Sequence, residues 1–330
     1  MKPLVVVTDF VGEPLDIERA VLGGEAEVVA AGALREGDLA GKVEEAEALL
    51  VYHFISVTDA TLARLKQCKL IVRCGAGTDN VDGKAAAQRG IPLANVPDYG
   101  TEDVADTAIG LMLSLTRGTH RLNMQGRPLD SQWHYKTAAP LRRLRGRVFG
   151  VVGLGRIGTA TALRAKAFGL DVVFFDPYVR DGFDKALGLR RAWSLAELLK
   201  QSHVVSLHCP LTDETRRIIR AETLAMMPAG SYLVNTARGD VVDTRALADA
   251  LNDGRLAGAG IDVLPQEPPS PDDALVKAWR DPNHPAHERL ILTPHAAFYT
   301  EEGLDDMRRK GCENVLRVLR GEAPRNVVNM

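Results

Sequence analysis

Three polar residues with complementary chemistry each follow a short apolar run. Arg238 follows LVNTA, Glu267 follows GIDVLPQ, and His295 follows LILTP. A histidine can donate a proton near neutral pH and accept one in the reverse direction. A carboxylate beside it stabilises the imidazolium, and an arginine can hold a carboxylate or polarise a carbonyl. Together they predict proton transfer on a carbonyl compound, although each residue alone could be a surface charge, a loop acid or a turn residue.

A glycine-rich segment supplies a second site. Gly153, Gly155 and Gly158 form GxGxxG around Arg156 and Ile157, with the apolar run VFGVVG before them and TATALRAKAFG after them. A strand, a tight turn and a helix in this order predict a loop that binds a dinucleotide pyrophosphate at the helix N-terminus.

The sequence also indicates which dinucleotide is bound. Asp176 ends the next predicted strand, 18 residues beyond the last glycine. A carboxylate there accepts hydrogen bonds from the ribose hydroxyls and repels a 2′-phosphate, which predicts NAD over NADP. The simpler alternative is that Asp176 only caps the turn before Pro177.

Strands alternate with Ala/Leu-rich helical segments along most of the chain, which is typical of parallel α/β sheets. One predicted helix covers Ala60–Gln67, and another runs from Thr244 to Asn252. The strands of the first hundred residues are predicted at Leu4–Asp9, Val28–Gly32, Ala48–Tyr52, Leu70–Cys74 and Ile91–Val96. Six more are predicted at Val148–Gly153, Asp171–Asp176, His203–Cys209, Ser231–Ala237, Gly258–Leu264 and Leu290–Pro294. We therefore expect an α/β protein with two doubly wound parallel sheets.

Two helix starts are marked by their first residues. The helix from Thr101 has Glu102 and Asp103 in its first turn, where acids favour the helix dipole. Its wide apolar face suits a domain core, a domain junction or a dimer interface equally well. Ser194 and Glu197 are spaced as a capping box.

Composition narrows the class of protein. The net charge of −2 argues against a nucleic-acid surface, and Arg142, Arg143, Arg145 and Arg147 are interpreted as a solvated lead-in to a strand. No apolar run approaches the ~20 residues of a membrane span, and the N-terminus resembles a core strand rather than a signal peptide. Four cysteines without metal-like spacing suit reduced thiols in the cytoplasm, and the HxxH at His284 and His287 is not expected to bind metal.

The segments GLGRIG, HCPLTDET, LVNTARGDVVD, AGIDVLPQEP and LTPHAA resemble, in order, the signatures of D-isomer-specific 2-hydroxyacid dehydrogenases. The likeness is strongest to the C-terminal-binding-protein-like branch and is specific from about Leu70 onward. It implies a Rossmann NAD-binding domain, a smaller flavodoxin-like substrate domain with the cleft between them, and a homodimer that acts on a small 2-oxo or 2-hydroxy acid.

The resemblance assigns roles residue by residue. Arg238, Glu267 and His295 take the catalytic positions, and Arg238 and His295 also face the substrate and the nicotinamide. The other implied cofactor residues are Cys209, Pro210, Thr215, Thr236, Ala237 and Asp262. The implied substrate residues are Arg73, Gly75, Ala76, Gly77 and Phe298. For Arg73 a structural salt bridge is the alternative. The implied domains are 1–100 with 299–330 for the substrate and 101–298 for NAD.

Three departures from the family pattern limit what the resemblance implies. The acidic, Pro-rich stretch between Glu267 and His295 is long, and we expect a surface insertion there. Phe298 stands where corepressor-type relatives carry Trp, so their substrate preference is not transferred. Because the given sequence ends at Met330, we expect no appended regulatory domain. An alternative function is a dinucleotide-sensing interaction protein similar to the corepressors, but a sensor does not need the complete Arg, Glu and His set.

Overall fold

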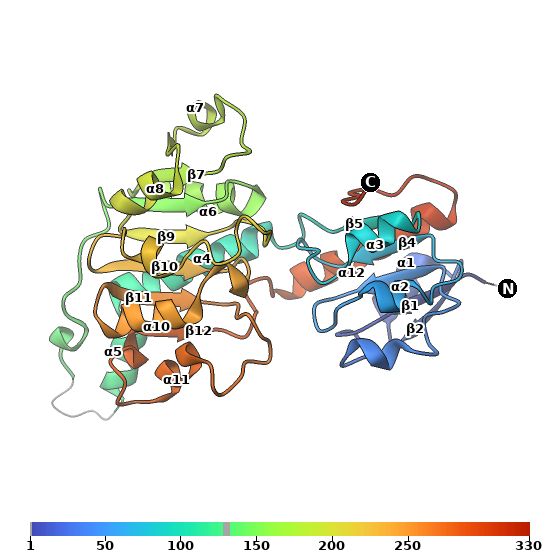
Figure 1. Ribbon diagram of the computed structural model, residues 1–330, viewed down its shortest axis with the longest axis horizontal. Coiled ribbons are helices and arrows are strands. Elements are labelled where there is room, and N and C mark those ends of the chain that lie inside the picture. The colour runs from blue at the N-terminus through green and yellow to red at the C-terminus, as the bar shows by residue number, and fades with distance from the viewer. Residues whose placement is uncertain (1, 128–132) are drawn as a thin grey trace. The chain divides into compact units, whose positions relative to one another are not determined.

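The computed structural model describes residues 2–127 and 133–330. The chain divides into two compact units, one made of residues 1–100 and 299–330 and the other of residues 101–298. Each unit contains one parallel β-sheet with helices on both of its faces (Figure 1). The two units are described separately below.

Unit 1, residues 1–100 and 299–330, contains a five-stranded sheet in the order β2-β1-β3-β4-β5. This is the flavodoxin-like order expected from the sequence, and it reverses direction between β1 and β3. The strands are β1 (Leu4–Val7), β2 (Glu27–Ala30), β3 (Ala48–Val51), β4 (Leu70–Arg73) and β5 (Leu93–Asn95). Because both faces are covered, β3 and β4 are buried along their whole length.

Helices α2 and α3 lie on one face of this sheet, and α1 and α12 pack together on the other. Their bounds, with the short 3-10 helix η1, are α1 (Asp16–Leu22), η1 (Glu36–Leu39), α2 (Asp59–Leu62), α3 (Gly83–Gln88) and α12 (Glu301–Leu319). The buried Glu18 of α1 accepts two hydrogen bonds from Arg308 of α12, at 2.6 and 2.7 Å. Helix α2 is shorter than predicted because Lys66 N–H instead donates to the carbonyl of Glu44.

Unit 2, residues 101–298, contains a seven-stranded sheet in the order β12-β11-β10-β9-β6-β7-β8. Counted from β6, this is the Rossmann order with one strand added at the far edge. The strands are β6 (Val148–Val152), β7 (Asp171–Phe175), β8 (Arg190–Arg191), β9 (Val204–Leu207), β10 (Ser231–Asn235), β11 (Leu256–Ile261) and β12 (Leu290–Leu292). The prediction of six strands missed β8, because two arginines carry no strand pattern.

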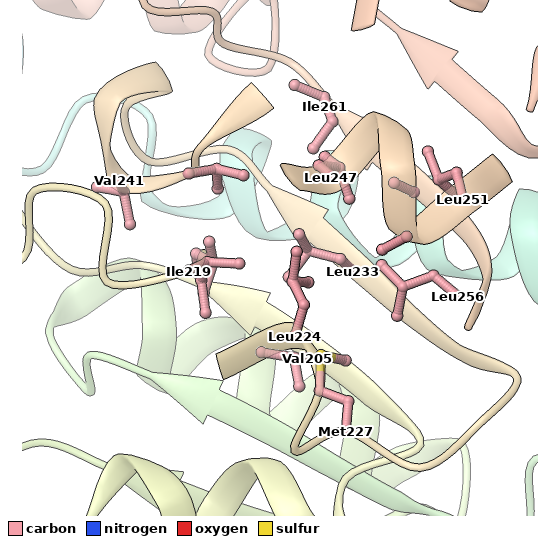
Figure 2. Packing of buried hydrophobic residues seen from close by; sticks show 14 of the residues in the cluster. Val205, Ile219, Leu224, Met227, Leu233, Val241, Leu247, Leu251, Leu256 and Ile261 are labelled. Carbon is pink, nitrogen blue, oxygen red and sulfur yellow. The ribbon is translucent and has the colours of Figure 1, made fainter. Parts of the chain in front are cut away.

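Alternate residues of each strand face opposite layers of unit 2. Val151 and Val234 pack toward α4 and α6, whereas Val205 and Leu233 pack toward the layer of α8 to α11 (Figure 2). The helices are α4 (Thr101–Arg117), α5 (Thr119–Gly126), α6 (Arg156–Ala167), α7 (Phe183–Leu187), α8 (Leu195–Gln201), α9 (Ala221–Leu224), α10 (Thr244–Asn252) and α11 (Ala274–Arg280). Three 3-10 helices complete the unit: η2 (Tyr135–Ala138), η3 (Gly239–Val241) and η4 (His287–Arg289).

Helix α4 belongs to the core of unit 2. Of the domain core, domain junction and dimer interface that its apolar face allowed, the structure shows the domain core. It packs on α6, β10 and β11. Gly258 and Gly260 of β11 make this approach possible, because a Cβ at either position would come within 3.0 Å of Leu115 or 2.9 Å of Leu111.

Two local expectations are corrected. The stretch after Glu267 is not only a surface insertion, because it contains α11, the crossover between β11 and β12, whose Leu275 is fully buried. The capping box at α8 is half formed. Ser194 Oγ accepts from Glu197 N at 3.1 Å, but the Glu197 carboxylate accepts from the N–H of Trp193 at 2.8 Å rather than from Ser194.

Candidate active site

Glu267 and His295 are in direct contact. Nδ1 of His295 lies 2.6 Å from Oε2 of Glu267. Since the carboxylate can only accept, Nδ1 carries the proton and Nε2 is left to face another group. Oε1 of Glu267 accepts from the N–H of Leu264 at 2.8 Å, which fixes the carboxylate on the loop that follows β11.

The His295 loop is held in a strained shape by Asp262. His295 has φ +51°, and its N–H donates to the Asp262 carbonyl at 2.8 Å. The buried Asp262 carboxylate accepts from the Thr293 hydroxyl at 2.5 Å and from the amides of Ala296 and Ala297, both at 3.0 Å. Asp262 therefore shapes the loop that presents His295, a role that the sequence did not reveal.

Arg238 stands one strand away from Glu267. It follows β10, Glu267 follows β11, and His295 follows β12, and these three strands are neighbours in the sheet. Asn235 sets the arginine's turn, because its side-chain amide donates to the Arg238 carbonyl at 2.9 Å and its Oδ1 accepts from Ala237 N at 3.0 Å. The Arg238 guanidinium donates to the Ala237 carbonyl at 2.7 Å. Nothing in the LVNTA pattern distinguished Asn235 as the organiser of this turn.

The ring of Phe298 lies beside the ring of His295. Its ring is buried and meets the His295 ring edge to face, with centroids 6.2 Å apart and planes at 82°. The structure thus places Phe298 beside His295.

The three glycines of GxGxxG differ in what their missing side chains permit. A Cβ on Gly153 (φ +90°) would lie 2.7 Å from Cys209 N, and one on Gly158 would lie 2.0 Å from the Gly153 carbonyl oxygen. A Cβ on Gly155 would meet nothing within 4 Å. Gly153 and Gly158 are needed for packing, whereas the open space at Gly155 fits a cofactor pyrophosphate.

Helix α6 leaves its first amides available for a ligand. It begins at Arg156 after Gly155, and no side chain caps it. The N–H groups of Arg156, Ile157 and Gly158 therefore lie at the positive end of the helix dipole without intrahelical acceptors. This arrangement fits a bound phosphate.

Asp176 serves the turn and remains placed for a ribose. One carboxylate oxygen accepts from Leu154 N at 2.8 Å and the other from Tyr178 N at 2.9 Å. Asp176 therefore does cap the turn at Pro177, as the simpler interpretation of the sequence suggested. A carboxylate has about four acceptor positions, so these two bonds leave capacity for ribose hydroxyls at the carboxyl end of β7.

The predicted adenosine loop is built partly by its own side chains. Thr215 Oγ1 donates to the Pro210 carbonyl at 2.6 Å and accepts from Thr212 N at 2.8 Å. Burial raises the pKa of the Cys209 thiol to about 11, so this cysteine is not a nucleophile at neutral pH. These contacts give Thr215 a structural role within the loop.

Thr236 supplies a different signal. Its side chain is 9% exposed, and among the described residues its hydroxyl has no hydrogen-bond partner. A buried hydroxyl without a partner is costly unless a ligand or water satisfies it. Thr236 and Ala237 lie between β10 and Arg238, so this hydroxyl fits a nicotinamide ribose.

Arg73 lies at the end of β4 in unit 1. Its side chain is nearly buried, and it donates from Nε to Asn80 Oδ1 at 3.3 Å and from Nη1 to the Cys74 carbonyl at 3.2 Å. A Cβ on Gly75 (φ +146°) would lie 1.6 Å from Arg73 Nη1, so a larger residue there would displace the guanidinium from its present position. Ala76 is held through its carbonyl by Asn95, and Gly77 continues the loop.

The remaining residues singled out in the sequence lie outside these sites. His287 Nδ1 contacts the Trp279 carbonyl, and His284 Nδ1 accepts from Ala286 N. No cluster of three metal-ligating side chains occurs within residues 2–127 and 133–330. All four cysteines are free. Across that same part of the chain, no helix is both long and apolar enough to span a membrane.

Comparison with known proteins decides the family. The family model of the D-isomer specific 2-hydroxyacid dehydrogenase NAD binding domain matches residues 109–297. The chain belongs to this family. Residues 109–297 are its NAD-binding domain.

Individual relatives extend the likeness to the whole chain. Caenorhabditis elegans C-terminal-binding protein 1 is 36% identical over 99% of this chain and 45% of its own length. Methanocaldococcus jannaschii D-3-phosphoglycerate dehydrogenase is 35% identical over 93% of this chain and 56% of its own. The chain thus spans about half the length of these curated relatives. The structure of Aquifex aeolicus D-lactate dehydrogenase with NAD and lactic acid aligns at TM-score 0.86 and 29% identity, covering 96% of both chains.

Proposed function

We propose that this protein is an NAD-dependent dehydrogenase that interconverts a small 2-oxo acid and its (R)-2-hydroxy acid. The observation that carries the proposal is the 2.6 Å contact between His295 and Glu267. This pair lies at the carboxyl edge of the sheet of an NAD-binding domain, which is where α/β proteins bind their ligands.

The residues divide the chemistry among them. A bound nicotinamide supplies or accepts the hydride. His295 donates a proton from Nε2 to the oxygen of the 2-oxo group during reduction, and it takes that proton back during oxidation. Glu267 fixes the tautomer and stabilises the imidazolium through Nδ1. Arg238 orients the substrate carboxylate or polarises the carbonyl, and Arg73 with the loop Gly75, Ala76 and Gly77 assists at the carboxylate.

The site favours NAD over NADP. Asp176 places a negative charge where a 2′-phosphate would lie, whereas ribose hydroxyls can donate to it. The uncapped start of α6 receives the pyrophosphate, and Thr236 receives the nicotinamide ribose. Asp262 acts behind His295 by fixing its loop, and Cys209, Pro210 and Thr215 shape the adenosine side. The two units then serve as a substrate domain and a cofactor domain.

The experiment is NADH oxidation with a panel of glyoxylate, hydroxypyruvate, 4-methylthio-2-oxobutyrate, phenylpyruvate and phosphohydroxypyruvate. His295→Ala is compared with His134→Ala, an exposed histidine of the same unit. Turnover that collapses only in His295→Ala supports the enzyme. Tight NADH binding without turnover of any 2-oxo acid would favour a dinucleotide-sensing interaction protein instead.

Assembly and location are part of the same proposal. We expect a homodimer because dimers are typical of the family that the sequence resembles, and a sedimentation measurement tests this. We expect the cytoplasm because four free thiols suit a reducing compartment.

A further inference from the structure

One loop of unit 2 runs from the end of β7 to the start of α7 and carries Asp176 (Figure 1). The Asp176 carboxylate is fixed from one side, because it accepts from the N–H groups of Leu154 and Tyr178. The Asp176 carbonyl is fixed by another residue, since it accepts from Nη2 of Arg191 at 3.3 Å. Arg191 belongs to β8, the edge strand that pairs with β7. It thus contacts the residue to which the proposed function assigns the choice of NAD over NADP.

The Arg191 guanidinium holds this loop at both of its ends. Its Nη1 donates to Asp181 Oδ1 at 3.0 Å, while its Nη2 donates to the Asp176 carbonyl. One planar group therefore joins the two ends of residues 176–181. A lysine cannot reproduce this arrangement, because a single ammonium on a flexible stem lacks the rigid fork of donors.

Burial and aromatic contacts keep the guanidinium in place. The Arg191 side chain is 10% exposed. Its guanidinium carbon lies 4.6 Å from the centroid of the Trp193 ring and 6.0 Å from that of the buried Phe174. A cation over an aromatic face is attracted to it, and more strongly where water is excluded. The guanidinium is therefore held against two rings as well as by its hydrogen bonds.

The half-formed capping box of α8 explains the position of Trp193. The Glu197 carboxylate accepts from the Trp193 N–H at 2.8 Å, so the first turn of α8 anchors the residue whose ring contacts Arg191. Trp193 is 71% exposed. An exposed tryptophan buries little apolar surface and adds little to the core. Its contact with Arg191 gives this ring a role that the core does not.

A structural explanation is that Arg191 only secures the edge strand β8. The neighbouring Arg190 has such a role, because it donates to Asp171 at 2.8 and 3.1 Å and to Gln201 at 2.8 Å. Asp171 begins β7, at the opposite end of the strand from Asp176. Arg191 instead contacts the residue that follows β7, at the carboxyl edge where α/β sheets bind ligands. The two adjacent arginines therefore act at different ends of the same strand.

We propose that Arg191 is a positioning residue for the cofactor. By fixing the Asp176 carbonyl and the loop to Asp181, it keeps the Asp176 carboxylate in the orientation that receives ribose hydroxyls and repels a 2′-phosphate. It thereby sets the preference for NADH over NADPH, and it acts through Asp176. The ion pair with Asp181 balances its charge, which lessens its attraction for a 2′-phosphate. This inference rests on the proposed role of Asp176 in NAD binding and adds the residue that supports that role.

The test is the ratio of the Kd of NADPH to the Kd of NADH, measured by calorimetric titration. Arg191→Lys keeps the charge and loses the fork of donors. We expect the Kd of NADH to rise about tenfold, because a hydrogen bond to a charged group is worth at least that factor. The Kd of NADPH should change little, so the ratio falls about tenfold. Arg190→Lys is the matched control and keeps the wild-type ratio.

Trp193 offers a second pair of variants at an exposed position. Trp193→Ala should lower the ratio about threefold, which is the size of a cation–aromatic contact. Trp193→Phe keeps an aromatic face and should restore most of the ratio. In steady-state assays of Arg191→Lys, the KM for NADH should rise while kcat at saturating NADH stays near that of the wild type, because His295 and Glu267 are unchanged.

The outcomes separate this inference from the function beneath it. If the wild type does not bind NADH, the proposed NAD-binding function fails. If the wild type binds NADH but Arg191→Lys keeps the wild-type ratio, the cofactor site stands and the role of Arg191 is wrong. Should Arg191→Lys not fold, a wild-type ratio in Trp193→Ala overturns the inference. A purely structural role would lower the melting temperatures of Arg191→Lys and Arg190→Lys alike and leave the ratio unchanged in both.

Discussion

The Glu267–His295 contact predicts that Glu267→Ala retains more activity than Glu267→Gln. In Glu267→Ala the imidazole loses its charged partner. A hydrogen bond to a charged group is worth about 1.5–3 kcal/mol, which corresponds to a loss of about 10–150-fold in kcat. Because the Glu267 and His295 side chains are 34% and 23% exposed, water can partly replace the carboxylate. We therefore expect a loss near the lower end of that range.

Glu267→Gln should be worse than the alanine, although glutamine is the closer match in shape. The N–H of Leu264 donates to Oε1 of Glu267, so the amide oxygen of a glutamine stays there. The NH₂ group then faces His295 Nδ1, which must become an acceptor. A histidine held in the wrong tautomer has cost about 10⁴ in another enzyme, and we expect a loss between that figure and the loss in alanine.

The assay is steady-state NADH oxidation with the best 2-oxo acid of the panel, alongside a fluorescence titration of NADH. Both variants should bind NADH as the wild type does, since Glu267 faces the histidine and the Leu264 amide. A Glu267→Gln enzyme that is more active than Glu267→Ala would refute the hydrogen-bond pattern on which the mechanism depends.

Further predictions follow from single positions. Gly158→Ala should fail to fold stably, because its Cβ would lie 2.0 Å from the Gly153 carbonyl oxygen. Gly155→Ala should keep the wild-type melting temperature but bind NADH about tenfold more weakly. Equal melting temperatures for Gly158→Ala and Gly155→Ala would contradict this contrast. Asp262→Asn should lower the free energy of unfolding by about 1–3 kcal/mol, because its amide would face the Ala297 N–H; a denaturant titration that shows no loss would be evidence against the role of Asp262 in the loop. Burial lowers the pKa of His208 from 6.5 to about 3. As the pH falls below 6.5, His208 is protonated in the unfolded chain but stays neutral in the folded one. The free energy of unfolding therefore decreases, by at most about 2 kcal/mol at pH 5. His208→Gln should make unfolding less sensitive to acid. An acid-unfolding midpoint equal to that of the wild type would contradict a lowered pKa for His208.

Sequence patterns predicted the elements whose apolar period is long and regular. All eleven predicted strands correspond to strands of the structure, with ends that shift by a few residues at sites such as Ile91–Val96, where β5 covers only Leu93–Asn95. Helix α10 covers Thr244–Asn252, as predicted. Strand β8 was missed because its two residues are both arginine.

Site residues were predicted where a side chain itself performs chemistry, as at His295 and Glu267. The residues that position them were not, because a supporting role depends on tertiary hydrogen bonds. The sequence predicted a cofactor role for Asp262, and the structure adds a second role, because its carboxylate accepts from two amides and a hydroxyl of the His295 loop. Asn235 and Asn80 hold Arg238 and the loop beside Arg73. The roles of Asn235 and Asn80 depend on which loops meet at the edge of a sheet. The spacing of residues along the chain does not show this.

The most direct test of the central claim is the identity of the product. The protein is incubated with NADH and phenylpyruvate, and any product is separated by chiral chromatography while NADH consumption is followed. The account predicts (R)-2-hydroxy acid in equal amount to the NADH consumed, and none with His295→Ala that still binds NADH. Formation of the (S) product, or undiminished product from His295→Ala, would contradict it.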